Sequence, residues 1–374
     1  MKNELLVKMV EEFALNVVKP RAREIDETES FPLDTVKEMA KYGLMGLPFS
    51  TEFNGVGADT KAYIDTIRII SKYCATTGTI LSAHTSLCSH PINQYGTVPQ
   101  KEKYLTKLNT GEYLGAFGLT EAGAGTDASR QQTKAVDCGD YYEITGSKIF
   151  ITNAGYADVY IIFAMTNAEL GLKGISAFII EKDLKGFTIG PKEKKMGIRG
   201  SSTCELIFDK VQIPKTQLLG KVGEGFKIAM TTLDGGRIGI AAQAQGIAES
   251  AFEKAVSYVK TRTQFGKPIA AFQHTQFVIA DLKTQIEAGR LLLYKAVEDK
   301  DNNLSYTESA AMAKLFCSRL AVEVADSAIQ LMGGYGYIRD YEVERYLRDA
   351  KITEIYEGTS EVQRMVIAGK VLRS

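Results

Sequence analysis

The sequence lacks an excess of charge of either sign. Its 374 residues contain 45 Lys plus Arg and 45 Asp plus Glu, so that the formal net charge is zero. Proteins that bind nucleic acids or anionic membrane surfaces usually carry clustered positive charge. We therefore expect neither a nucleic acid nor a membrane among the partners of this protein.

Long apolar runs are also missing. No stretch of the chain approaches the ~18 consecutive apolar residues that a membrane-spanning helix requires. The first residues, Met1-Lys2-Asn3-Glu4, continue into an acid-containing amphipathic pattern, and not into the apolar core of an export signal. We expect no membrane span, no export signal and no transit peptide.

Cysteine is scarce, and its spacing does not suggest pairs. The five cysteines are widely scattered, and none belongs to a Cys-x-x-Cys motif. An odd number of scattered cysteines is typical of reduced thiols, which predicts a cytoplasmic protein. His84 and His90 have no acidic or cysteine neighbours at ligand spacing, so that we predict no metal site.

Two common nucleotide-binding motifs are absent as well. The chain contains neither the Gly-x-Gly-x-x-Gly of a Rossmann fold nor the Gly-x-x-x-x-Gly-Lys-Ser/Thr of a phosphate loop. We also find no low-complexity segment and no internal repeat. Any nucleotide cofactor must therefore be bound by contacts that are dispersed along the chain.

The hydrophobic pattern divides the chain into three domains. Residues 1–115 have the apolar spacing of helices. Residues 116–218 contain short strand-like runs between turn residues, and residues 142–152 alternate around a Gly-Ser turn. Residues 219–374 return to long helical patterns. Because no helical pattern separates the strands, the middle domain cannot be a doubly wound sheet, and the whole chain is predicted to be α+β.

Near the C-terminus, Glu357 lies at a joint between two helical patterns. Gly358 is a poor residue for a helix interior. Ser360, with Gln363 three residues later, has the spacing of a capping box that begins a new helix. A carboxylate at such a joint can be held in a fixed position, although a solvated loop carboxylate is the simpler interpretation of the pattern alone.

The segment KITEIYEGTSEVQR, residues 351–364, resembles the C-terminal signature of the acyl-CoA dehydrogenases. In that family the Glu of Tyr-Glu-Gly-Thr removes a proton from the acyl thioester, which implies that Glu357 is the catalytic base. We expect burial to raise its pKa to roughly 6–7 once substrate expels water. The resemblance further implies a substrate contact at Gly358 and cofactor contacts at Thr359 and Glu361.

A second motif, FGLTEAGAGTD in residues 117–127, resembles the flavin and substrate loop of this family. Glycines allow a backbone to approach a flat or phosphorylated ligand closely. Ala122 replaces the usual proline, and Thr126 stands where many members have serine. The resemblance implies flavin contacts at Phe117, Leu119 and Thr120 and a contact with the acyl-CoA at Thr126.

The run KIFITN, residues 148–153, resembles the next flavin-contact strand. Phe150 could cover one face of the flavin, and Thr152 could hydrogen-bond near its reactive nitrogen. The alternative is an ordinary hairpin strand with Phe150 in the core.

The run LDGGR, residues 233–237, resembles the substrate helix of the family, in which the Asp and Arg contact CoA. This implies substrate contacts at Asp234 and Arg237, and Ser201 is a further candidate. Some branches of the family place their catalytic Glu at the position that we assign to Gly235. Since glycine has no carboxylate, only Glu357 can be the base.

Three further segments, residues 262–266, Gln273 and residues 330–336, resemble those that bind the pyrophosphate and adenosine of FAD, partly across a subunit boundary. An arginine suits pyrophosphate because it stays charged and donates in a fork. The cofactor candidates in these segments are Arg262, Gln264, Gln273, Gln330, Gly333 and Gly334.

The motifs follow the family's order along the whole chain, which implies an N-terminal helical domain, a β-barrel-like middle domain and a C-terminal four-helix bundle. The sequences of these motifs are most similar to those of short-chain, butyryl-CoA-type enzymes of bacteria. The resemblance implies a homotetramer with one FAD per chain that removes an α-proton and a β-hydride from a short-chain acyl-CoA in fatty acid metabolism. Electrons would pass to electron-transfer flavoprotein. A 2-enoyl-CoA reductase on the same scaffold and a non-catalytic flavin- or CoA-binding subunit are the alternatives.

Overall fold

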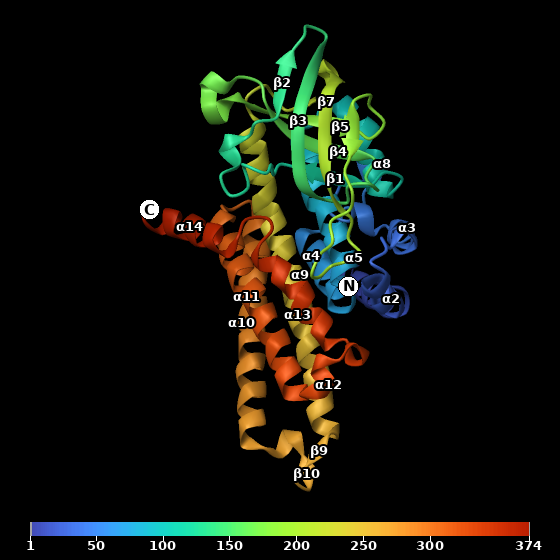
Figure 1. Cartoon of the computed structure of the whole chain (residues 1–374), viewed down its shortest axis with the longest axis vertical. Helices are drawn as coiled ribbons and strands as arrows, with labels where there is room; N and C mark the ends of the chain where they lie inside the picture. The colour runs from blue at the N-terminus through green and yellow to red at the C-terminus, as the bar shows by residue number, and fades with distance from the viewer. Residues whose placement is uncertain (1, 374) are drawn as a thin grey trace.

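The computed structural model describes residues 2–373, and Figure 1 shows an elongated molecule with its large β-sheet at one end. Met1 and Ser374 lie outside the described residues. In residues 2–373, no helix combines the length and the apolar character that crossing a bilayer requires. The N-terminal helices of more than one turn are α1 (Lys2–Phe13), η1 (Ala14–Val18), α2 (Ala22–Thr28), α3 (Leu33–Lys41), α4 (Thr60–Tyr73), α5 (Ala75–Ser82), η5 (Ala83–Ser89), α6 (His90–Tyr95), η6 (Lys101–Leu105) and α8 (Thr106–Thr110).

The middle domain is an eight-stranded sheet with the order β6-β7-β3-β2-β4-β5-β8, in which β1 pairs in parallel with β4. Strands β4 and β5 are apolar and buried on both faces, and they pair antiparallel. The strands are β1 (Gly115–Gly118), β2 (Lys134–Asp137), β3 (Tyr141–Thr152), β4 (Val159–Met165), β5 (Ile175–Glu181), β6 (Phe187–Ile189), β7 (Thr203–Pro214) and β8 (Leu218–Leu219).

The predicted Gly-Ser turn in residues 142–152 is wrong. Strand β3 continues through Gly146 and Ser147 and pairs with β7 on both sides of them, with a register shift between Ile144 and Gly146. Gly146 has φ +145°, and a Cβ on it would lie 2.7 Å from the Cα of Thr133. The glycine therefore marks a bulge where two backbones approach closely, and not a turn.

The C-terminal domain is built on the 37-residue helix α9 (Gly225–Thr261), which at 1.5 Å per residue is ~55 Å long. In Figure 1, α9, α10 and α11 run away from the sheet, and the short hairpin of β9 (Thr263–Gln264) and β10 (Lys267–Pro268) lies at the far tip. The other helices are α10 (Gln273–Asp301), α11 (Thr307–Met332), α12 (Gly334–Tyr337), α13 (Val343–Lys351) and α14 (Ser360–Val371).

The predicted fold class, helical at both ends with a sheet domain between, is confirmed. The last helix before the sheet ends at Thr110, and α9 begins at Gly225. The domain limits at residues 115 and 218 stay a prediction.

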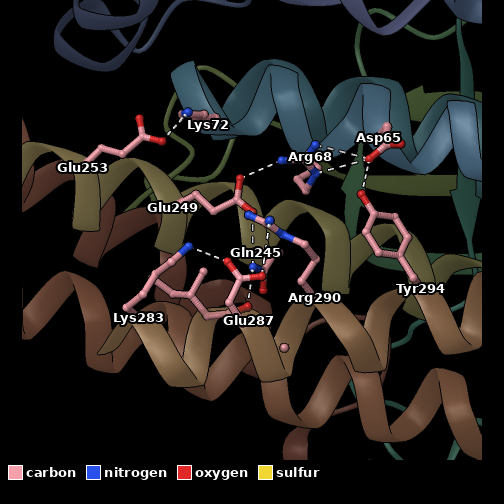
Figure 2. A network of polar contacts seen from close by, with 12 residues as sticks. Asp65, Arg68, Lys72, Gln245, Glu249, Glu253, Lys283, Glu287, Arg290 and Tyr294 are labelled. Carbon is pink, nitrogen blue, oxygen red and sulfur yellow. Dashed lines mark hydrogen bonds and ion pairs between the residues drawn. The ribbon is translucent and has the colours of Figure 1, made fainter. Parts of the chain in front are cut away.

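A buried ion network joins α4 and α10 to the middle of α9 (Figure 2). Both oxygens of the buried Glu249 on α9 are paired, with Arg68 on α4 at 2.7 Å and with Arg290 on α10 at 2.9 Å. Asp65 accepts hydrogen bonds from Arg68 and from Tyr294. Removing one member of a buried network leaves an uncompensated charge, so these contacts fix the rotation of α9 about its axis. That rotation decides which α9 residues face Glu357.

Candidate active site

Glu357 lies in a tight turn between the short helix η12 (Ile352–Glu354) and α14. Its φ is +53°, and the following Gly358 has φ +91°. A non-glycine residue in the left-handed region costs conformational energy and persists only where its surroundings impose it. Here Lys314 Nζ and Gln363 Nε2 donate to the carbonyl of Gly358 at 2.6 Å and 2.8 Å. These two hydrogen bonds hold the turn that carries the carboxylate.

The predicted capping box at Ser360 is wrong by one residue. The N-cap of α14 is Thr359, whose Oγ1 accepts a hydrogen bond from the backbone N–H of Val362 at 3.4 Å. Ser360 is the first helical residue, and the side chain of Gln363 donates back to the turn. The side chain of Gln363, which we expected to cap the helix, therefore stabilises the turn that contains Glu357.

The carboxylate of Glu357 is poorly compensated. Within residues 2–373, its Oε2 is buried and accepts no hydrogen bond. Burial raises the pKa of Glu357 to about 7, and the positive charges of Lys314 and Arg237 limit the rise. A base acts best when its pKa lies near the working pH. We expected the pKa of Glu357 to reach this range once substrate expels water. Burial by the chain alone already raises the pKa to about 7.

Gly236 on α9 makes room for this carboxylate. A Cβ on Gly236 would lie 2.0 Å from Glu357 Oε2 and 2.9 Å from Leu87 Cδ2, whereas a Cβ on Gly235 would meet only Lys300 Nζ, at 3.6 Å. Successive residues of a helix point about 100° apart, so that only one of the two glycines can face Glu357. Our assignment of the facing position to Gly235 is therefore wrong, and the position is Gly236. Neither residue has a carboxylate, and Glu357 remains the candidate base.

The two residues of α9 that we predict to contact CoA, Asp234 and Arg237, are hydrogen-bonded to each other. Arg237 Nη1 donates to Asp234 Oδ1 at 2.6 Å, and Thr307 Oγ1 donates to Asp234 Oδ2 at 2.7 Å. Arg237 is 5% exposed, and its Nε has no acceptor among the described residues. An unpaired donor on a buried guanidinium is suited to a polar ligand that reaches this end of α9.

The loop that resembles a flavin loop is hydrogen-bonded to strand β3. The backbone N–H of Ile149 donates to Thr120 O at 2.9 Å, and the buried Lys148 Nζ donates to Leu119 O at 3.2 Å. Lys148 Nζ also forms a 2.7 Å ion pair with Glu121. These contacts bring Leu119 and Thr120 to the edge of β3, beside the residues of the second predicted flavin segment.

Phe150 is not a core residue, and the alternative of an ordinary core strand is therefore wrong. Its side chain is 62% exposed, and its φ is +60°. Thr152 follows in register with Thr203 of β7, and Phe117 on β1 packs edge-on against Phe163. An exposed aromatic ring on a rigid strand can cover a flat ligand.

The two remaining substrate candidates differ in exposure. Thr126 is exposed and follows glycines 123 and 125, whose Cβ positions are open. Ser201 is fully buried, and its hydroxyl is unpartnered in the part of the chain that the structure describes. Thr126 thus lies on an accessible loop, whereas Ser201 could reach a ligand only in an enclosed site.

The pyrophosphate candidates gather at the far tip of α9. Five of the six predicted residues line one cavity of about 430 Å³, namely Arg262, Gln264, Gln330, Gly333 and Gly334. Gln273 lies outside this lining, exposed at the start of α10. The guanidinium of Arg262 lies 5.6 Å from the ring centre of Tyr335. Open space at the Cβ positions of Gly333 and Gly334 forms a cradle that side chains would fill, which fits a pyrophosphate-bearing cofactor.

The two groups of FAD candidates lie at opposite ends of α9. Gly236, beside Glu357, and Arg262 are 26 positions apart, which corresponds to ~39 Å along a helix. Figure 1 shows the sheet and the β9–β10 hairpin at opposite ends of the molecule. One extended FAD cannot contact both groups in a single chain.

Comparison with known proteins agrees with this geometry. Sequence models described as the N-terminal, middle and C-terminal domains of acyl-CoA dehydrogenase match residues 2–112, 116–211 and 223–372. The chain belongs to the acyl-CoA dehydrogenase family. A relative from Clostridium acetobutylicum, named short-chain specific acyl-CoA dehydrogenase, is 58% identical over 372 residues and covers 100% of this chain and 98% of its own.

Two solved structures extend the likeness to three dimensions. Butyryl-CoA dehydrogenase from Megasphaera elsdenii has a TM-score of 0.98 at 49% identity and covers 99% of this acyl-CoA dehydrogenase and 98% of its own chain. A chain in the structure described as the electron transferring flavoprotein of Acidaminococcus fermentans has a TM-score of 0.98 at 51% identity, with coverage of 100% and 98%. The resemblance inferred from the motifs is thereby confirmed.

Sequence reasoning missed two residues that shape the Glu357 turn, Lys314 and Gly236. Lys314 is fully buried on α11. The sequence could have indicated Lys314, because it is the single lysine within the otherwise apolar run Ala310–Phe316. A charge in a buried helix face requires a buried acceptor. Gly236 could not be separated from Gly235 by the sequence, because the rotation of α9 depends on contacts with distant helices.

Proposed function

We propose that this acyl-CoA dehydrogenase oxidises short-chain acyl-CoA thioesters to trans-2-enoyl-CoA, with Glu357 as the base. The observation that carries the proposal is the buried, unpartnered Oε2 of Glu357 opposite Gly236, in a group whose pKa is about 7. The names of the relatives from C. acetobutylicum and M. elsdenii support a butyryl-CoA-like substrate.

In the proposed reaction Glu357 Oε2 takes the α-proton of the thioester. The left-handed turn, held by Lys314 and Gln363 at the carbonyl of Gly358, keeps the carboxylate at one place. Lys314 and Arg237 stabilise the ionised form, so that the base is free to accept a proton near neutral pH. When bound, FAD supplies the acceptor for the hydride that leaves the β-carbon.

We infer that the FAD site is completed by a second copy of the chain. Phe117, Leu119, Thr120, Phe150 and Thr152 would contact the flavin, with Thr359 and Glu361 nearby at the start of α14. The cradle at Arg262, Gly333 and Gly334 would bind the pyrophosphate and adenosine of a neighbouring copy's FAD, because the two groups are too far apart for one cofactor in one chain. We propose a homotetramer with one FAD per chain.

We propose that electrons leave through electron-transfer flavoprotein, which the similarity to a chain in the A. fermentans structure supports. All five cysteines are free, which supports a cytoplasmic protein.

A panel of acyl-CoA and enoyl-CoA thioesters, followed by the flavin absorbance, tests the proposed function. We expect butyryl-CoA to bleach the flavin faster than longer acyl chains do. Reduction of enoyl-CoA by the pre-reduced enzyme, without bleaching by any saturated acyl-CoA, would instead show a 2-enoyl-CoA reductase. Binding of thioesters without any redox change would show a non-catalytic subunit.

A further inference from the structure

A second cavity, of about 160 Å³, lies beside the Glu357 site, between the N-terminal helices and the start of α9. Its wall includes Gly235, the immediate neighbour of Gly236, which faces Glu357, and Ser86, the immediate neighbour of Leu87, which lies close to Gly236. Neither Glu357 nor Gly236 lines it, so it is separate from the proposed reaction site. Its polar lining includes Thr60, Tyr63, His90, Asn93 and Lys300.

Lys300, which is half-buried, differs from the fully buried lysines of this protein. Lys148 donates to Glu121, and Lys314 donates to the carbonyl of Gly358. In residues 2–373, by contrast, the ammonium of Lys300 has no hydrogen bond or ion pair, and its Nζ lies 5.8 Å from the ring centre of Tyr306. Burial lowers the pKa of Lys300. A half-buried ammonium without a partner is suited to an anionic acceptor, and no Asp or Glu lines the cavity.

The other polar groups of the cavity offer donors as well. His84, outside the cavity, uses both ring nitrogens, at Leu108 O and at the N–H of Gly115. His90 has no such partner among the described residues, and burial together with Lys300 lowers its pKa to about 3, so that it is neutral and keeps one N–H. The side chains of Thr60 and Asn93 are likewise without a hydrogen bond in the described part of the chain. Several unpaired donors therefore surround one positive charge.

The volume limits what can bind. A ligand pocket typically measures roughly 300 Å³ or more, and one water occupies ~30 Å³ of the liquid. A cavity of about 160 Å³ accepts a molecule of a few heavy atoms only. We propose that this cavity binds a small free anion of the carboxylate or phosphate class, with Lys300 as its charged partner and His90 and Asn93 as hydrogen-bond donors. This site goes beyond the proposed dehydrogenation and does not depend on it.

Thermal unfolding of the purified protein tests the site. Acetate and phosphate are added separately, at an ionic strength kept constant with a buffer anion too large for the cavity. A ligand that binds only the folded protein raises the unfolding midpoint, and we expect a rise of ~2 °C at tenfold excess over the dissociation constant. Lys300→Met should lose this rise, whereas Lys185→Met, which removes an exposed lysine of the sheet domain, should keep it.

A response to acetate alone, or to phosphate alone, assigns the class of anion. Asn93→Leu is the second variant, because it removes a donor and narrows the cavity while Lys300 stays in place; it should also lose the rise. Equal shifts in the wild type, Lys300→Met and Asn93→Leu, or no shift in any of them, would show that the cavity holds water only and would overturn the proposal.

Discussion

Replacing Gly236 by alanine should disable Glu357 without unfolding the protein. The new Cβ would lie 2.0 Å from Glu357 Oε2, and contacts shorter than 3.0 Å do not occur, so that the carboxylate must move by at least 1.0 Å. The oxygen is the end of a flexible side chain, and alanine is favoured over glycine in a helix by about 0.5–1 kcal/mol. The free energy of unfolding should therefore change little, while the position of the base changes.

The expected loss of rate follows from that displacement. A misplacement of ~1 Å in a reacting group costs about 10²-fold, or about 2.7 kcal/mol in the activation free energy. The assay is the rate of flavin reduction by butyryl-CoA in a stopped-flow spectrometer, with the unfolding midpoint measured in parallel. Gly235→Ala is the matched control, because it adds the same methyl group one residue away and meets only Lys300, at an ordinary 3.6 Å.

Gly235→Ala should retain most of the reduction rate. Equal losses in both variants would mean that added bulk at this end of α9 blocks the substrate, and a larger loss at Gly235 would return the facing position to that residue. A Gly236→Ala enzyme with the wild-type rate would refute the placement of Glu357 opposite Gly236.

Four further outcomes are expected. Glu357→Gln keeps the shape of the side chain and removes the base, so that flavin reduction should fall by at least ~10³-fold while FAD and acyl-CoA still bind; more than about a tenth of the wild-type rate would exclude Glu357 as the base. The reduction rate of the wild type should rise as the pH increases through about 7, because the carboxylate must be ionised. Lys314→Met should move that midpoint upward, since the ammonium lowers the pKa of Glu357; an unchanged midpoint would contradict this. Arg262→Ala should weaken FAD binding, and light scattering that shows a stable, fully flavin-loaded monomer would exclude the shared site.

The sequence was most informative where the functional residue and the motif that identifies it lie in the same short segment. Glu357 was predicted from the motif around it, and its placement at a joint between helices is confirmed. The predicted rise in its pKa follows from burial, a general consequence of holding a carboxylate between packed helices. The order of the domains was likewise readable from hydrophobic periodicity, which reports on each segment separately.

The predictions that failed depend on contacts between distant segments. The bulge at Gly146 reflects the approach of Thr133 in another segment of the chain. The cap at Thr359 is the exception, because its contacts are local and the prediction missed it by one residue. The choice between Gly235 and Gly236 is a matter of helix rotation, which packing against α4 and α10 decides. Local propensity cannot report such contacts, because the partner lies in another part of the chain.

The length of α9 has a genetic consequence. In the proposed assembly each chain gives its base to one reaction site and its Arg262 cradle to another. A chain altered at Glu357 therefore damages the site that contains its own base, whereas a chain altered at Arg262 damages the site of a neighbour. When the two kinds of chain assemble together, some sites receive an intact Glu357 from one and an intact Arg262 from the other. An allele inactivated at Glu357 and an allele inactivated at Arg262 should thus complement each other when they are expressed in the same cell.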